Sequence, residues 1–377
     1  MMLSEIFCQD KAVNTLTRAF ETGRIPHAYI FEGIDGIGKY TTALAWSKLL
    51  LCKSPAKNIA PSSPQRGFAA TSCGKCPSCL AFEVDSHPDF HHIYKELLKL
   101  NSDANKRKRQ ALDLPVDVIR DFLVDKVQLK PSLSESKIFI VSEAEKLNTE
   151  SQNLLLKTLE EPPNKSFIIL LCTKLDNLLP TTKSRCQIVH FGPLDEEKII
   201  EYLTEKDVNK QEAKFWARLT GGSIGQADLF SKLAPSFYGI KKELLDRFSK
   251  FQSADAVDFA QWLNSASSAP SESWQKLKGD TSKSDLTRQA KRAVVSIIIS
   301  AFTDAMKISF AGAEKMTNFD QPQQIKRLAE RFGPEACAGI IELCYETVRF
   351  IDASVNEKLV FEHLLLNCGD CGIIKIS

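Results

Sequence analysis

The sequence of 377 residues has little net charge and no long apolar run. Its 49 Lys and Arg residues oppose 47 Asp and Glu residues, which gives a formal net charge of +2. Charge alone therefore gives no argument for nucleic acid or a membrane as a partner. No stretch of about 18 apolar residues occurs, so we expect no membrane-spanning helix. The first ten residues are mixed in character rather than a signal-peptide core, so we expect a cytoplasmic protein with no membrane partner.

The composition is that of a folded globular protein, with 43% hydrophobic and 25% charged residues. The length suits two or three domains of about 100–200 residues each. Residues 1–193 alternate short β-rich apolar runs with amphipathic stretches, which predicts an α/β domain with a parallel sheet and crossover helices. The predicted strands are Ala28–Phe31, Ile138–Val141, Phe167–Cys172 and Gln187–Phe191.

The pattern changes after residue 193. Residues 194–236 predict three short helices, at Glu196–Lys206, at Lys210–Leu219 and from Ser223 onward. Residues 238–377 have helical periodicity and little strand signal, so we expect an all-α region there. Its long candidate helices are Ser284–Lys307, Pro334–Ile351 and Asn356–Leu366.

Two segments interrupt the first domain. Lys53–Thr71 is rich in Pro, Ser and Ala without periodicity, which predicts an exposed loop. Leu100–Gln110 contains the basic run Lys106–Arg109. Such a run suits a DNA-contacting loop, a targeting signal or a solvated loop, and the residues alone leave these alternatives open.

The eleven cysteines are an odd number and are unevenly spread, which does not suit a secreted disulfide framework. Cys73, Cys76 and Cys79 have the C-x₂-C-x₂-C spacing that lets thiolates reach one tetrahedral zinc ion. Cys52 is the best candidate for the fourth ligand of a structural Zn²⁺ site. The alternative is a surface hairpin with free thiols. Weaker candidates for the fourth ligand are His87 and His91, and a second C-x₂-C pair stands alone at Cys368 and Cys371.

A phosphate-binding loop follows the first predicted strand. The run from Gly33 to Lys39 has the spacing G-x-x-x-x-G-K between a strand and a helix. Its glycines, Gly33, Gly36 and Gly38, let backbone N–H groups curve around a phosphate, and the helix N-terminus adds positive potential. Lys39 would reach the terminal phosphates. The sequence therefore predicts a P-loop fold.

Both magnesium ligands of such a site are missing. The position after the lysine should hold Ser or Thr but holds Tyr40, and Thr41 points about 100° further around the helix. The strand Ile138–Val141 should be followed by Asp and Glu, but it is followed by Ser142 and Glu143. We therefore expect no Mg²⁺ site and weak or absent ATP binding. Metal-poor nucleotide binding and a purely structural turn both remain open.

Several short motifs occur around these features. Asn153–Pro163 contains N-L-L-L-K-T-L-E-E-P-P, and Ser184-Arg185-Cys186 follows it. Gly23–Tyr29 precedes the phosphate loop, and His87–Phe90 follows the cysteines. These runs resemble the signatures of clamp-loader subunits of the AAA+ family. The run Asp352–Glu362 resembles the C-terminal part of the delta-prime class of subunit in bacterial DNA polymerase III. The resemblance covers residues 1–235 closely and the last domain only near its end.

This resemblance implies three domains in a clamp loader, a pentameric ring that places a sliding clamp on primed DNA. The domains would be an AAA+ ATPase-like domain at 1–193 with a zinc module at about 52–79, a helical lid at 194–236 and a helical collar for oligomerisation at 238–377. The implied partners are gamma/tau and delta subunits, the beta sliding clamp and primer–template DNA. The chain would be part of a hetero-oligomer within a DNA-directed DNA polymerase holoenzyme.

The resemblance also assigns residue roles. Arg185 would act as an arginine finger in trans, completing the ATP site of the adjacent subunit. Thr173 would stand at the first sensor position, and the four cysteines match the family's zinc module, although the gap after Cys52 is longer than usual. Motor subunits keep Lys-Thr and Asp-Glu where this chain has Lys39-Tyr40 and Ser142-Glu143. The run from Gly222 also has glycine where motor subunits carry a sensor arginine.

The leading hypothesis is therefore a clamp-loader subunit without ATPase activity of its own, which braces the ring and supplies Arg185 to a neighbour. The alternative is an active gamma/tau-type ATPase with unusual metal ligation. The expected nucleotide-facing residues are Gly33, Gly36, Gly38, Lys39, Tyr40, Thr41, Glu143 and Thr173. The expected zinc ligands are Cys52, Cys73, Cys76 and Cys79.

Overall fold

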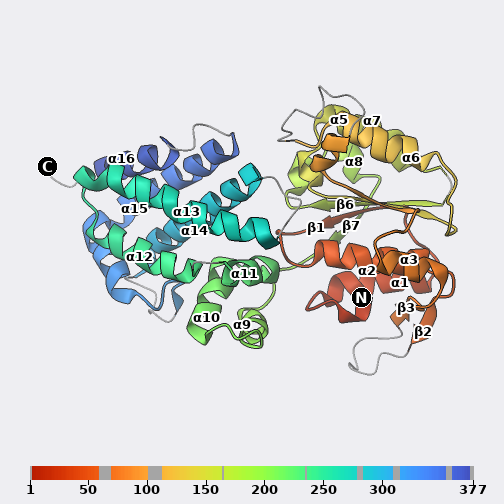
Figure 1. The fold of residues 1–377 in the computed structure, drawn as a ribbon, viewed down its shortest axis with the longest axis horizontal. Coiled ribbons are helices and arrows are strands. Elements are labelled where there is room, and N and C mark those ends of the chain that lie inside the picture. Colours follow the sequence, from red (N-terminus) through yellow and green to blue (C-terminus); the bar gives the residue numbers. More distant parts are fainter. Residues whose placement is uncertain are drawn as a thin grey trace. The chain divides into compact units, whose positions relative to one another are not determined.

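The computed structural model describes residues 2–58, 69–100, 113–163, 165–233, 236–277, 283–308, 315–353 and 359–373. The chain divides into two compact units, Met1–Leu194 and Asp195–Ser377 (Figure 1). The basic run Lys106–Arg109 lies outside the described residues, as do residues 354–358 of the motif at 352–362.

A five-stranded parallel sheet forms the centre of the first unit. Its strand order is β4-β5-β6-β1-β7. The strands are β1 (Ala28–Glu32), β4 (Phe90–Ile93), β5 (Lys137–Val141), β6 (Ser166–Cys172) and β7 (Gln187–His190). All four pairings in this sheet are parallel. The carboxyl ends of the strands therefore meet at one edge, where ligands bind in open α/β sheets.

Helices cover both faces of this sheet (Figure 1). Helices α1 (Asp10–Glu21), α2 (Lys39–Leu51) and α3 (Pro77–Glu83) lie on one side. The other side carries α5 (Val116–Ile119), α6 (Asp125–Val127), α7 (Thr149–Glu160) and α8 (Pro180–Lys183). A π-helical segment, Arg120–Val124, joins α5 to α6. Short 3₁₀ helices are η1 (Leu3–Glu5), η2 (Lys95–Leu100), η4 (Ala144–Lys146) and η5 (Leu175–Asn177).

The central strands are mostly apolar because helices cover both faces of the sheet. Every residue of β5 is buried, and β1 and β6 are buried at all but one position each. One cluster of buried side chains joins these strands to α7 and to the α5–α6 segment, with Ile30, Phe139, Leu155 and Leu170 among its members. The predicted α/β class with a parallel sheet is confirmed.

Two features of this unit differ from the prediction. The strand β4 was not expected, because only Ile93 in it is fully buried, as befits an edge strand. The segment Lys53–Thr71 is not simply an exposed loop, since β2 (Ala56–Asn58) and β3 (Ala69–Thr71) pair antiparallel across it. Ala70 and Thr71 are buried. Residues 59–68 lie outside the described part of the chain.

The second unit is helical throughout its described residues. Its first three helices are α9 (Glu196–Thr204), α10 (Lys210–Leu219) and α11 (Ile224–Ser231), close to the predicted ranges. The remaining helices are α12 (Phe237–Lys250), α13 (Ala256–Leu277), α14 (Lys283–Lys307), α15 (Pro322–Asp352) and α16 (Leu359–Ile373), with a 3₁₀ turn, η6, at Ser253–Asp255. The expected all-α C-terminal region is confirmed. No helix among the described residues is long and apolar enough to cross a membrane.

Helix α15 is longer than the predicted helix from Pro334. Gly333, with φ 66° and ψ 170°, is not helical, so two helices meet there at a kink. Pro334 suits the first position of the second helix, where a missing N–H costs nothing. The first half, from Pro322, was not predicted. The predicted start of the last helix, Asn356, lies outside the described residues, and α16 is described from Leu359.

An aromatic cluster joins the short helices of the second unit to the long ones. The Trp216 ring stacks on the Phe237 ring at a centroid distance of 5.6 Å. Phe230 contacts both rings and Trp274. The cluster spans the predicted border at residues 236–238, and the division into lid and collar stays a prediction.

Candidate functional site

The phosphate loop lies at the carboxyl end of β1. Gly33 has φ 152°, and a Cβ there would come within 2.5 Å of the Phe191 carbonyl oxygen, so only glycine fits. Gly38, with φ 99°, is the residue before α2. Residues other than glycine rarely adopt these backbone conformations, which fold the loop back over the start of the helix.

The Lys39 ammonium group points into this loop. Its Nζ donates to the carbonyl oxygens of Gly33, at 2.5 Å, and Ile34, at 2.8 Å. Burial lowers the pKa of Lys39, although the nearby carboxylates of Asp35 and Glu145 oppose this. The lysine is thus anchored by the loop and surrounded by acidic groups of its own chain.

The two positions that should hold magnesium ligands face each other across a histidine. His92 lies on β4 and pairs in register with Ile140 of β5, so its side chain lies on the same sheet face as Ser142. Its Nε2 is 2.8 Å from the Ser142 hydroxyl, and its Nδ1 is 3.4 Å from the Tyr40 hydroxyl. The rings of Tyr40 and His92 lie 4.8 Å apart. Burial lowers the pKa of His92 to about 4, so the ring is neutral at pH 7.

The acidic residues after β5, Glu143 and Glu145, both contact other side chains of the chain. Glu143, with φ 52°, pairs with Lys146 and lies 3.9 Å from Lys95. The Thr173 hydroxyl at the end of β6 donates to Glu145 at 2.5 Å, and the Thr173 N–H donates to the same carboxylate at 3.2 Å. Thr41 is partly exposed at the start of α2. The structure therefore gathers Lys39, Thr173 and Glu143 at one sheet edge.

His92 and Glu145 were missed by the sequence reasoning. The His92 contacts depend on the pairing of β4 with β5, and no local sequence pattern predicts that pairing. Glu145 had a signal, because it stands two residues after Glu143, close to the end of a recognised strand.

The four predicted cysteines come together. Their Sγ atoms all lie within 4.8 Å of one another. Tetrahedral zinc at about 2.3 Å from each sulfur would need sulfur separations of about 3.8 Å, and Cys73 and Cys79 lie 4.0 Å apart. These cysteines form a cluster that could hold a metal ion.

Backbone groups support the cysteine cluster. The N–H groups of Cys73, Cys76 and Cys79 donate to sulfur atoms of the cluster, at 3.3, 3.3 and 3.4 Å. Such bonds favour thiolates, and backbone donors lower the pKa of Cys73 to about 6. Burial raises the pKa of Cys79 to about 12. A bound cation would deprotonate the thiols that coordinate it, so Cys73 and Cys79 would both be thiolates despite their different pKa values.

The two candidate histidine ligands lie elsewhere. His87 Nε2 is 2.9 Å from the Ser78 hydroxyl and 3.2 Å from the Ser134 hydroxyl. The His91 ring stacks on Phe139. Of the second C-x₂-C pair, Cys368 is buried, and the Cys371 side chain lies outside the described part.

Arg185 follows α8 and precedes β7. Its side chain is 32% exposed and pairs with Glu160 at the end of α7. Its Nε donates to Glu160 at 2.7 Å, and one terminal nitrogen donates to the Thr181 carbonyl at 2.8 Å. Arg185 is thus held at the surface of the first unit with part of its guanidinium in solvent.

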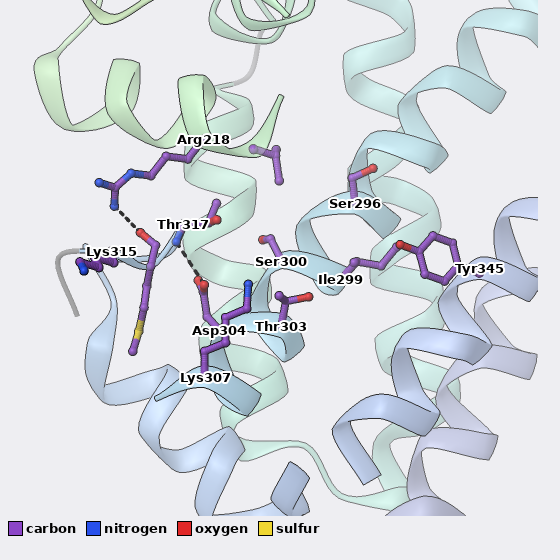
Figure 2. Close-up of a pocket in the computed structure, with 12 residues that line it drawn as sticks. Arg218, Ser296, Ile299, Ser300, Thr303, Asp304, Lys307, Lys315, Thr317 and Tyr345 are labelled. Carbon is purple, nitrogen blue, oxygen red and sulfur yellow. Dashed lines mark hydrogen bonds between the residues drawn. The ribbon is translucent and has the colours of Figure 1, made fainter. Parts of the chain in front are cut away.

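A pocket of about 350 Å³ lies in the second unit (Figure 2). None of the predicted site residues lines it. Arg218 donates to the Met316 carbonyl at 2.5 Å, and Asp304 accepts from the Thr317 N–H at 3.2 Å. These polar groups hold the segment at 316–318 against α10 and α14.

Comparison with known proteins gives two family matches. The model described as DNA polymerase III, delta subunit, matches residues 8–195. The model described as DNA polymerase III, delta subunit, C terminal, matches residues 284–369.

Curated relatives agree with these matches. The chain is 27% identical over 354 residues to the DNA polymerase III subunit delta' of Escherichia coli, covering 93% of this chain and 91% of that protein. It is 25% identical over 363 residues to the delta' subunit of Bacillus subtilis, covering 95% of each. It is also 31% identical over 230 residues to the E. coli subunit tau, covering 59% of this chain and 31% of that protein.

Proposed function

The chain belongs to the delta' subunit family of DNA polymerase III, and from that premise we propose that it is a clamp-loader subunit that does not hydrolyse ATP itself. Its partners would be the gamma/tau and delta subunits, and through the assembled ring the sliding clamp and primer–template DNA. The similarity to a tau subunit supports assembly with related AAA+ chains.

One observation carries the non-hydrolysing role. Tyr40 and Ser142 stand where a P-loop NTPase has its two protein ligands for magnesium, and both hydroxyls contact His92. Without the metal, charge on the transferring phosphoryl group is not neutralised, and Glu143 has no anchored metal-bound substrate to act on. The alternative, a gamma/tau-type ATPase with unusual metal ligation, requires the purified chain to hydrolyse ATP.

The second part of the proposal is that Arg185 acts in trans. A guanidinium at a neighbour's ATP site would stabilise the charge that develops on the phosphoryl group. The partly exposed side chain and its anchor on Glu160 and Thr181 support this role, because the group is oriented but open to a partner.

The four cysteines are proposed to hold structural zinc. Four thiolates satisfy a tetrahedral ion completely, so no open position remains for catalysis. The backbone N–H groups that donate to the sulfurs support this assignment.

The trans role is tested by Arg185→Ala in the reconstituted complex. We expect the ring to assemble and its clamp- and DNA-stimulated ATPase to fall about tenfold or more, less than the full effect of an arginine finger because the other sites keep theirs. Arg120→Ala, at an exposed arginine paired with Asp117, is the control and should retain activity.

Glu160→Gln separates the arginine from its ion pair. This variant keeps Arg185 and should retain most of the ATPase activity. Equal activity of the Arg185→Ala and wild-type complexes would refute the trans role. Equal loss in the Glu160→Gln and Arg185→Ala complexes would assign the effect to the ion pair instead.

A further inference from the structure

His92 lies between the side-chain hydroxyls of Tyr40 and Ser142. In P-loop NTPases the metal is bound by the hydroxyl after the loop lysine and by a carboxylate after the second key strand. The matching positions here are Tyr40 and Ser142, and the His92 ring lies within hydrogen-bonding reach of both. The imidazole therefore occupies the space between the two ligand positions.

The ring is fixed there by its surroundings. It packs between two tyrosine rings, with centroid distances of 4.8 Å to Tyr40 and 4.9 Å to Tyr94. Its two nitrogens face the Tyr40 and Ser142 hydroxyls, so one nitrogen can donate while the other accepts. Its backbone belongs to a strand paired in register with β5, which leaves little freedom to withdraw.

We propose that His92 is a specificity-determining residue that excludes magnesium-bound nucleotide from this phosphate loop. The inference rests on the proposed non-hydrolysing function and deepens it, because the loss of metal binding would have three parts rather than two. Two parts are the ligand losses at Tyr40 and Ser142. The third is the filling of the vacated space by a side chain from β4.

Restoring the two magnesium ligands should not restore magnesium binding while His92 is present. Tyr40→Thr with Ser142→Asp restores both ligand types but keeps His92. A carboxylate at position 142 would lie beside the His92 ring, which would still fill the space between the two restored ligands. The Tyr40→Thr/Ser142→Asp variant should therefore still not bind magnesium-bound nucleotide.

The experiment measures ATPγS binding to the purified full chain by calorimetry, in Mg²⁺ and in EDTA. The wild-type chain and the Tyr40→Thr/Ser142→Asp variant should show no gain in affinity from Mg²⁺. Adding His92→Ala to that double variant should produce a gain of about tenfold or more. A second triple variant with His92→Ser provides the same comparison if the alanine variant does not fold, and circular dichroism verifies the fold of each.

The outcomes distinguish two failures. A double variant that gains as much from Mg²⁺ as the triple variants would overturn the role of His92, as would folded triple variants with no gain. A wild-type chain that already binds ATPγS more tightly in Mg²⁺ would also overturn it, whereas ATP hydrolysis by the purified wild-type chain would instead contradict the proposed non-hydrolysing function. The expected pattern, a gain only when His92 is removed, supports both.

Discussion

The second unit contains a buried ion pair between Lys241 and Asp320. Lys241 is fully buried, and its Nζ lies 2.5 Å from Asp320, which is 5% exposed. The Tyr238 hydroxyl donates to the same carboxylate at 2.8 Å, and the Phe215 ring centroid lies 4.6 Å from the ammonium group. Burial lowers the pKa of Lys241 to about 8 against the opposing effect of Asp320. The pair therefore depends on both charges being present.

Asp320→Asn should lower the free energy of unfolding of the second unit by about 3–5 kcal/mol, because it leaves a buried ammonium group without its carboxylate. Urea denaturation followed by circular dichroism measures this. The double variant Lys241→Met/Asp320→Leu should lose less than the single variant, since no buried charge remains. Asp246→Asn, at an exposed pair with Lys250, should cost under about 1 kcal/mol. A similar cost for both single variants would contradict this account.

At the scale of elements, the cysteine cluster ties three segments together. Cys52 follows α2, Cys73 follows β3 and Cys79 lies in α3. The Ser78 hydroxyl, beside Cys79, donates to the Leu51 carbonyl at 2.7 Å, which brings the start of α3 to the end of α2. A metal at the cluster would therefore fix the β2–β3 hairpin against these helices.

The purified chain should contain about one equivalent of zinc by metal analysis, and Cys76→Ser should reduce this content well below one. Strong chelation should lower the melting temperature, because binding energy of the metal contributes to folding. Cys8→Ser, at a cysteine outside the cluster, is the matched control and should keep full zinc content. Full zinc content in the Cys76→Ser variant would reject the ligand set.

The elements that the sequence predicted well are those with a local cause. The strands β1, β5 and β6 each contain a run of at least four apolar residues because both faces of the sheet are covered. The spacing of Cys73, Cys76 and Cys79 is likewise a local chemical signal, and the predicted fourth member, Cys52, lies with them in the fold. The edge strand β4 and the three-residue strands β2 and β3 exist through pairing with distant partners, which no local pattern contains. His92 was missed for the same reason.

At the scale of the whole molecule, the proposal separates the chain's own phosphate loop from its contribution to a neighbour. The loop keeps Gly33, Gly38 and Lys39, but Lys39 is bound to loop carbonyls and lies near Asp35 and Glu145. Arg185 instead lies on a surface turn. Arg185 should therefore be needed for the ATPase activity of the assembled complex, and Lys39 should not.

Lys39→Ala should leave the clamp-stimulated ATPase of the reconstituted complex within about twofold of wild type, because this loop is proposed to contribute no turnover. The substitution removes a donor from two loop carbonyls, so a loss of about 1–3 kcal/mol of stability is expected and is measured separately by thermal denaturation. The matching lysine of a gamma/tau subunit, replaced in the same complex, provides the positive control. A loss of activity with Lys39→Ala in an intact ring, together with ATP hydrolysis by the purified wild-type chain, would support the active-ATPase alternative instead.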